Sequence, residues 1–268
     1  MDRRILNRRM FLSDLGKGTL AIAILGAGAC SSGATSTSPT SGPAGGSEVP
    51  PTTTRLLVPS STGSAPTAMP AAGELDWERV NLGFVSAYVL ARGNRAAIVD
   101  TGVAGSAAQI DEALQVVGLT WGEVDHVLLT HMHGDHVGSV GEVLDAASAA
   151  TGYAGAADVG AIGSPRPLEP VFDGDEVFGL QVIGTPGHTE GHISVLDREA
   201  GLLVAGDALN GDDGLITGPN PQFTSDIERA NASVKRLAQE QFDTAVFGHG
   251  DPVTTGASDL VRALAETL

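Results

Sequence analysis

The part of the sequence from Glu74 to Leu268 predicts one α/β domain, and two observations support this prediction. From Leu75 onward, short apolar runs typical of strands alternate with amphipathic stretches typical of helices, and no segment repeats with a fixed period. Four of the apolar runs end at a turn that contains a His or an Asp. Strand ends are where α/β folds place their sites, so the same pattern indicates where the chemistry lies.

The domain is expected to open with a β-hairpin. Residues 84–90 predict a strand, Gly93 and Asn94 a turn, and residues 95–99 the return strand. This hairpin delivers Asp100 to a strand end.

A helix and a buried strand are predicted next. Ser106 is a candidate N-cap for a helix with one apolar face, and Gly118 is placed to end it. Residues 124–129 form a nearly continuous apolar run, which favours a strand covered on both faces. That strand leads directly to His131.

Three further strand-like runs in the second half each lead to a turn with a His or an Asp. The runs cover residues 177–183, 202–205 and 244–247, and they lead in order to His188, Asp207 and His249. A helix is predicted over residues 225–239, with Ile227 on its apolar face.

The run His131-Met132-His133-Gly134-Asp135-His136 predicts a metal site. It offers three imidazoles and a carboxylate within six residues, on a loop where Gly134 permits a tight backbone. A single histidine would more often be a core residue, but three of the seven histidines lie here. Imidazole and carboxylate donors suit zinc, and iron and manganese use the same donors.

Composition and charge narrow the class of function. Apolar residues make up 42% of the chain and charged residues 18%, which is a globular balance. The formal net charge is −17, and five of the 15 basic residues but only two of the 32 acidic residues precede Cys30. The domain is therefore strongly acidic and would repel phosphate backbones, so we expect a small-molecule substrate and no nucleic acid.

Residues 1–29 predict a signal peptide. The run from Asn7 to Leu12 contains paired arginines and resembles a twin-arginine export signal, although Asn7 stands where Ser or Thr is usual. The apolar stretch from Thr19 to Ala29 is too short for a mature membrane span. An ordinary secretory signal is the alternative, and both predict export.

Cys30, the only cysteine, is the predicted lipid-attachment residue. It directly follows small residues in a run that resembles a bacterial lipobox, with Ala27 where a large aliphatic residue is expected. Diacylation would anchor the protein to the outer face of the cytoplasmic membrane; without it the protein would be periplasmic or secreted. Residues 30–73, rich in Ser, Thr, Pro and Gly, predict a flexible linker, and residues 74–268 the folded domain.

The motifs together resemble those of the metallo-β-lactamase superfamily. The run from His131 to His136 matches the family's HxHxDH signature, and the runs TPGHTEGH, GDAL and GHG follow in the family's order. The similarity spans about Val80 to Pro252. It implies an αββα sandwich, in which two mixed sheets face each other with helices outside and two metal ions at one sheet edge.

The resemblance also implies roles for individual residues. His131, His133 and His188 would hold the first divalent ion, Asp135, His136 and His249 the second, and Asp207 would bridge them. Zinc is the expected metal, with iron or manganese as possibilities. Asp100 would orient a ligand from behind, and Asp135 would also be catalytic, since it can orient a water molecule or accept its proton.

The implied activity is metal-dependent hydrolysis of a small ester, thioester, lactone or amide outside the cytoplasm, by a hydroxide shared between the ions. No tyrosine follows Tyr153, which disfavours the quorum-signal lactonases, and only nineteen residues follow His249, too few for a glyoxalase-II-type substrate domain. Two alternatives remain: an iron-dependent oxygen or sulfur redox enzyme on the same fold, and a non-catalytic tethered binding module.

The other polar and aromatic residues of interest are expected to lie outside the set of metal ligands. His192 is expected to support the site without binding metal, and His126, Trp77 and Trp121 are expected to be structural. Asn210 is a candidate substrate contact. The loop over residues 154–170 is expected to contribute to the pocket wall.

Overall fold

The structure, a computed structural model, describes residues 74–268. The predicted signal peptide (1–29) and the linker with Cys30 (30–73) lie outside the described residues. Within residues 74–268, no helix has both the length and the apolar character needed to cross a membrane.

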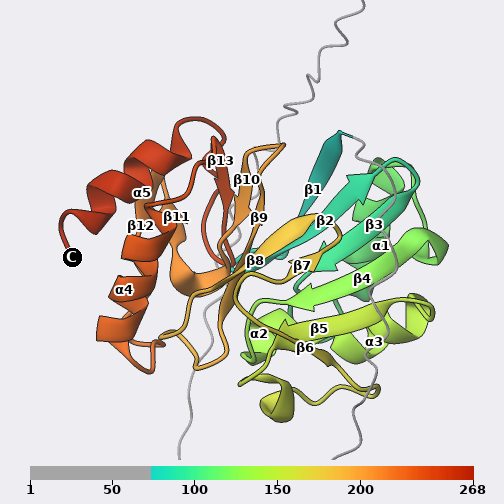
Figure 1. Ribbon diagram of the computed structural model, residues 1–268. Coiled ribbons are helices and arrows are strands. Elements are labelled where there is room, and N and C mark those ends of the chain that lie inside the picture. Colours follow the sequence, from blue (N-terminus) through green and yellow to red (C-terminus); the bar gives the residue numbers. More distant parts are fainter. Residues whose placement is uncertain (1–73) are drawn as a thin grey trace, which may run out of the picture. The chain divides into compact units, whose positions relative to one another are not determined.

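The first sheet has six strands in the order β1-β2-β3-β4-β5-β6 (Figure 1). The first three strands pair antiparallel, and the last three join in parallel. The predicted hairpin and the buried strand after it are confirmed. The strands are β1 (Leu75–Asn81), β2 (Ser86–Arg92), β3 (Arg95–Val99), β4 (Val124–Leu129), β5 (Thr151–Gly155) and β6 (Glu169–Val171).

The second sheet has five strands in the order β13-β10-β9-β8-β7. Strands β13 and β10 pair in parallel and the others antiparallel, so both sheets are mixed. The strands are β7 (Glu176–Val177), β8 (Leu180–Gly184), β9 (Ile193–Asp197), β10 (Leu202–Val204) and β13 (Thr244–Val246); a separate hairpin comprises β11 (Asn210–Asp212) and β12 (Leu215–Thr217).

The single strand predicted over residues 177–183 is wrong, because this run forms a tight hairpin. Phe178 and Gly179 have φ angles of 58° and 74° and connect β7 to β8, with Val177 paired to Leu180. Two consecutive residues at positive φ are the conformation of a two-residue hairpin turn. Phenylalanine rarely takes this conformation, so the sequence carries little sign of the turn.

Helices cover the outer face of each sheet (Figure 1). α1 and α3 lie against the first sheet, and α4 and α5 against the second. The short helix α2 follows β4. The helices are α1 (Ala107–Val116), α2 (Gly134–Val137), α3 (Val140–Ala146), α4 (Ile227–Leu237) and α5 (Ala257–Ala265), with short 3-10 turns at Trp121–Glu123, Val159–Ala161 and Gly206–Ala208.

Two details of the predicted helices are corrected. Ser106 precedes α1 as expected, but its hydroxyl donates to the carbonyl of Val103 (2.7 Å) and does not cap the helix. Asp226 caps α4, where its carboxylate accepts from the Arg229 N–H (3.0 Å). Ile227 is therefore in the first turn, where it is 37% exposed and does not belong to the buried face.

Three apolar clusters define four layers. One lies between α1, α3 and the first sheet, one between the two sheets, and one between the second sheet and α4, α5. Alternation along β2 shows the principle, since Val89 packs toward the helices and Leu90 toward the other sheet. The αββα sandwich is thus confirmed.

Tyr88 joins the two sheets by a buried polar contact. Its hydroxyl donates to the carbonyl of Phe247 (2.7 Å) and accepts from the Phe247 N–H (3.2 Å). Burial is the largest influence on this hydroxyl and raises the pKa of Tyr88 to about 12. The contact fixes the end of β13, two residues before His249.

We expect Tyr88→Phe to lower the free energy of unfolding of the full chain by about 1–3 kcal/mol, because two buried backbone groups of Phe247 lose their partner. Urea denaturation measures this. Tyr153→Phe, at a half-buried position, is the control and should cost less. Equal losses in the two variants would show that the contact does not stabilise the fold.

Candidate metal centre

All seven predicted donors converge at the edge where the two sheets meet. Each arrives from the end of a strand: β4 leads to His131, His133 and to Asp135 and His136 in α2, β8 leads to His188, β10 to Asp207 and β13 to His249. Backbone hydrogen bonds link these ends. Ile193 donates to Thr130 across the sheets (2.9 Å), and Gly248 donates to Gly206 (3.1 Å).

Three imidazoles form the first donor group. His133 Nδ1 lies 3.0 Å from His131 Nε2 and 2.9 Å from His188 Nε2. Nitrogen donors about 2.0–2.1 Å from one metal ion lie roughly 3 Å from each other, so the spacing suits a shared ion. Burial lowers the pKa of His188 to about 4 and that of His131 well below its usual value. Both rings are therefore neutral at pH 7 and have a free lone pair for a metal.

Asp135, His136 and His249 form the second group. Asp135 Oδ2 lies 3.9 Å from His136 Nε2 and 3.5 Å from His249 Nε2. One donor atom from each residue falls within 4.8 Å of the others, as also holds for the first group. His136 is buried, whereas His249 and Asp135 reach the surface of the site.

The carboxylate of Asp207 lies between the two groups. Its Oδ2 is 3.4 Å from His188 Nε2 and 3.2 Å from His249 Nε2, and its Oδ1 is 3.3 Å from His136 Nε2. Burial alone would raise the pKa of Asp207, but the adjacent imidazoles of His136 and His249 hold it well below its usual value. An ionised carboxylate in this position can contact a cation on either side.

The buried polar atoms of the site fit a metal ion. Among the described residues, three buried side-chain atoms have no hydrogen-bond partner of good geometry, and two of them, His136 Nε2 and Asp207 Oδ1, face each other. Buried polar atoms are rarely left unpaired, and a cation would bind both. The pKa of His136 supports this: burial would lower it, but Asp100 and Asp207 raise it to about 10. The local field therefore favours positive charge.

Asp100 contacts His136 on the side of the ring that faces away from the other donors, the position that the family resemblance implied for it. Its Oδ2 lies 2.8 Å from His136 Nδ1, and its Oδ1 accepts from the Thr130 N–H at 2.7 Å. The Thr130 hydroxyl donates to the same carboxylate (2.8 Å) and lies 3.1 Å from His131 Nδ1. The Asp100 carboxylate thus orients His136 directly and His131 through Thr130, and Nε2 of His136 faces the site.

His192 supports Asp207 and does not join either donor group. Its Nε2 accepts from the Asp207 N–H (3.0 Å), and its Nδ1 bonds the Thr185 hydroxyl (2.8 Å). Complete burial lowers the pKa of His192 to about 3, so the ring is neutral and can accept at Nε2. The prediction that it lies outside the metal set agrees with this geometry.

Asp158 is a buried residue that sequence reasoning missed. Its carboxylate accepts from the Met132 N–H (3.0 Å), the Thr189 hydroxyl (2.6 Å) and the Gly191 N–H (2.7 Å). It therefore ties the loop that carries His131 and His133 to the loop that carries His188. It lies in the turn after β5, where a single Asp among small residues gives no signal in the sequence.

Two further residues were missed. The Thr224 hydroxyl lies 3.2 Å from His188 Nδ1 and orients that ring from the loop before α4. Gly248 leaves space for the site, because a Cβ there would lie 2.2 Å from Asp207 Oδ1. The GHG motif contained this glycine, but its role emerges only from the packing.

The remaining candidates lie elsewhere. His126 is half-buried between Tyr153 and Phe178, with ring centroids 5.6 and 5.7 Å away, as expected for a structural residue. The amide of Asn210 donates to the Gly218 carbonyl (2.8 Å), and its side chain does not line the cleft described next. Trp77 and Trp121 pack against the apolar clusters.

A cleft of about 1070 Å³ opens above the two donor groups. Its rim is apolar: Phe84 and Phe223 are 64% and 60% exposed, and Met132 is 37% exposed. The loop over residues 154–170, expected in the wall, does not line it. The lining residues come instead from six segments: Phe84, Met132–Asp135, His188–Glu190, Asp207, Asn220 with Gln222–Ser225, and His249.

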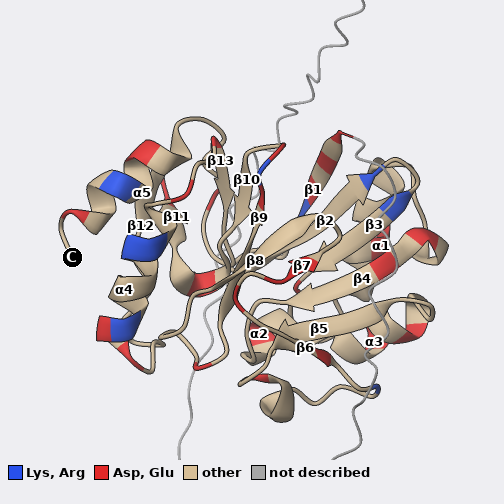
Figure 2. Ribbon diagram, in the orientation of Figure 1, with Lys and Arg blue, Asp and Glu red and all other residues tan. Residues whose placement is uncertain are grey.

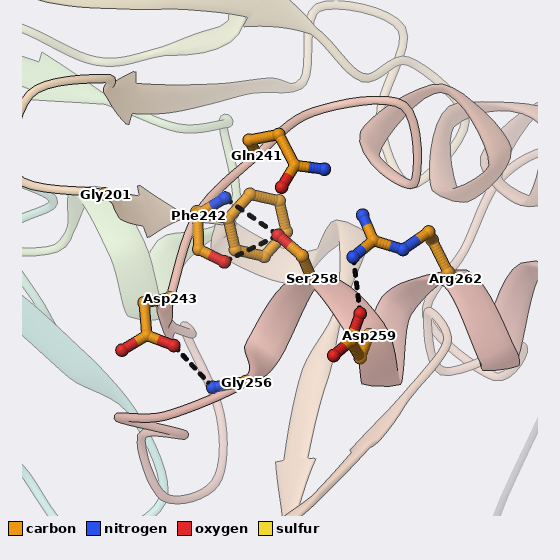
Figure 3. A pocket seen from close by; sticks show the side chains of 8 residues that line it. All are labelled: Gly201, Gln241, Phe242, Asp243, Gly256, Ser258, Asp259 and Arg262. Atoms are coloured by element: carbon orange, nitrogen blue, oxygen red, sulfur yellow. Dashed lines mark hydrogen bonds and ion pairs between the residues drawn. The ribbon is translucent and has the colours of Figure 1, made fainter.

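A second cavity of about 370 Å³ lies beside α5, remote from the donors (Figure 3). Its polar side chains bond within the wall: Asp243 accepts from the Gly256 N–H (2.7 Å), Ser258 bonds the backbone of Phe242, and Arg262 pairs with Asp259. These groups stabilise the start of α5, so we assign the functional site to the larger cleft.

The comparisons with known proteins agree with this site. The model of the metallo-beta-lactamase superfamily matches residues 80–249. The chain is 30% identical over 201 residues to the probable metallo-hydrolase YflN of Bacillus subtilis, covering 59% of this chain and 76% of YflN. It is 31% identical over 167 residues to a hydroxyacylglutathione hydrolase of Aeromonas hydrophila, covering 60% of this chain but only 58% of that enzyme.

Among solved structures, the chain resembles TTHA1623 in a di-iron-bound form. The TM-score is 0.55 at 28% sequence identity, and the match covers 65% of this chain and 92% of TTHA1623. A relative of the same fold therefore holds two metal ions.

We expect Asp158→Asn to weaken metal retention by about 10–100-fold, since an amide cannot accept from all three donors that face the carboxylate. Metal content after dialysis against a graded chelator measures the change. Asp259→Asn, an exposed substitution on α5, is the matched control and should retain metal like the wild type. Unchanged retention in Asp158→Asn would mean that the two loops hold their geometry without this carboxylate.

Proposed function

The chain belongs to the metallo-beta-lactamase superfamily, and we propose that it is a hydrolase with two divalent metal ions that cleaves a small ester, thioester, lactone or amide. One observation carries the proposal: the Asp207 carboxylate lies between two groups of metal donors at the floor of a cleft large enough for a small molecule.

The residues of each group have defined parts in this proposal. His131, His133 and His188 would hold the first ion, Asp135, His136 and His249 the second, and Asp207 both. Two such ions would lower the pKa of a shared water toward neutrality and polarise the scissile carbonyl. Asp135 lines the cleft and is 29% exposed, so its carboxylate can orient that water or accept its proton.

Zinc is the metal that we propose, because neutral imidazoles with two carboxylates are its usual donors. The di-iron-bound relative supports iron as a second candidate. If iron is native, redox chemistry with oxygen or sulfur substrates is the alternative function. Metal analysis of protein purified without added metal, together with an oxygen-uptake assay with thiols, separates the two functions.

The relatives favour hydrolysis. YflN bears the name probable metallo-hydrolase, and the Aeromonas relative bears the name hydroxyacylglutathione hydrolase, although the chain spans only 58% of its length. A non-catalytic binding module would not need all seven donor side chains in one cluster. A panel of ester, thioester, lactone, phosphodiester and β-lactam substrates on metal-loaded protein tests the proposal; no turnover of any of them would contradict it.

Export and membrane attachment are proposed from the sequence alone. The twin-arginine-like run and Cys30 support a lipid-anchored protein on the outer face of the cytoplasmic membrane. A twin-arginine route carries folded proteins, so metal would bind before export. The substrate would then be outside the cytoplasm.

Asp207→Ala should reduce the metal content from two ions per chain toward none and abolish turnover, because both donor groups lose a shared ligand. Elemental analysis and the substrate panel measure the two effects. A variant with full metal content and normal turnover would refute the bridging role.

Cys30→Ser should move the protein from the membrane fraction to the soluble fraction of the producing cell, because the thiol that carries the lipid is lost. Immunoblots of the two fractions measure the shift. Continued membrane fractionation would mean that another segment is the anchor.

A further inference from the structure

We infer that the cleft selects substrates whose acyl portion is uncharged and apolar, and that it discriminates against substrates with a second anionic group such as a remote carboxylate. The inference rests on the proposed function, since it specifies what the hydrolase would cleave. It follows from the charges and the apolar surface of the cleft wall.

The charged side chains that line the cleft, within residues 74–268, are acidic. They are Asp135, Asp207 and Glu190, and none of the lining residues in this part of the chain is a lysine or an arginine. The positive charge of bound metal would be concentrated at the floor, on the scissile group. A carboxylate elsewhere on the substrate would meet no cation at the wall, so it would lose hydration without compensation.

The guanidinium groups that contact the borders of the cleft are already paired. Arg229 forms an ion pair with Glu190. Arg79 donates to the Gly250 carbonyl (2.8 Å) and to Asp251 (2.8 Å), next to His249. Figure 2 shows the basic residues mainly on α4, α5 and the first strands of the six-stranded sheet. The wall therefore offers a substrate acidic groups and neutral groups.

Apolar side chains of the cleft supply the attractive contacts with the acyl chain of the substrate. Phe84, Met132 and Phe223 line the cleft, yet they are 64%, 37% and 60% exposed. The Phe84 ring also stacks near His249, with centroids 6.3 Å apart and planes at 15°. Covering such side chains with an acyl chain is favourable because it removes apolar surface from water. An alkyl or aryl chain that extends from the scissile carbonyl would make this contact.

The reaction itself balances without a further reagent. The oxygen of water forms a bond to the acyl carbon, the bond from that carbon to the leaving oxygen, sulfur or nitrogen breaks, and a proton from the water passes to the leaving group. The products are a carboxylic acid and an alcohol, thiol or amine, which stay in one molecule when the substrate is a lactone.

A matched pair of esters tests the inference on the metal-loaded full chain. The 4-nitrophenyl ester of hexanoic acid and the mono-4-nitrophenyl ester of adipic acid share a leaving group and a six-carbon chain, and only the latter carries a carboxylate. After subtraction of spontaneous hydrolysis, we expect kcat/KM to be about tenfold or more higher for the hexanoate ester. Equal values, or a higher value for the adipate ester, would overturn the inference and leave the hydrolase intact. Hydrolysis of neither ester, with two metal ions bound, would also overturn the inference, and the hydrolase would then stand or fall on the wider substrate panel.

Two variants locate the effect in the cleft. Glu190→Gln releases Arg229 and should reduce the preference for the hexanoate ester by raising kcat/KM for the adipate ester. Its control is Asp259→Asn, which breaks a similar pair with Arg262 on α5. Phe223→Ala should raise KM for the hexanoate ester, whereas Phe172→Ala, also 60% exposed but outside the cleft, should not. Loss of preference in the controls, or unchanged preference in both cleft variants, would overturn the assignment.

Discussion

The buried carboxylate of Asp207 is the constraint on which the rest of the site depends. It is only 6% exposed, so its charge must be balanced within the protein. Its oxygens lie 3.2–3.4 Å from imidazole nitrogens of three residues, His136, His188 and His249, which follow three different strands. Each of those nitrogens would turn toward a metal ion on one side or the other of the carboxylate. We propose that this anion attracts two cations and sets where they would lie.

The fold holds that carboxylate in place by backbone contacts. His192 accepts from the Asp207 N–H, and Gly206, with a φ of +57°, makes the turn that presents the side chain. A side chain at Gly206 would collide with His192, since its Cβ would lie 2.8 Å from Nε2. Across the site, a Cβ at Gly248 would lie 2.2 Å from Asp207 Oδ1 and 2.4 Å from His136 Cε1, so this position also requires glycine. Small residues at strand ends thus allow two sheets to share one cluster of donors.

That these seven side chains lie together could be predicted from the sequence, because most of them are local or directly follow a strand. The run from His131 to His136 contains four donors, and the short strands before His131 and His249 each end in apolar residues, Val127–Leu129 and Ala245–Phe247. The hairpin at Phe178 could not be predicted, because its turn depends on a rare conformation of a bulky residue. The residues that orient the donors could not be predicted either. Asp158 contacts Met132, 26 residues away in sequence, and Thr224 contacts His188, 36 residues away, and nothing in the neighbouring sequence indicates these contacts. The cleft wall over residues 220–225 depends in the same way on how α4 docks.

We propose that the Asp207 carboxylate joins two metal ions, and anomalous X-ray diffraction from crystals of metal-loaded protein can test this proposal. Two anomalous peaks in contact with Asp207 are expected, one beside His131, His133 and His188 and the other beside Asp135, His136 and His249. A single peak at full metal loading, or two peaks without Asp207 between them, would refute the bridging role of this carboxylate.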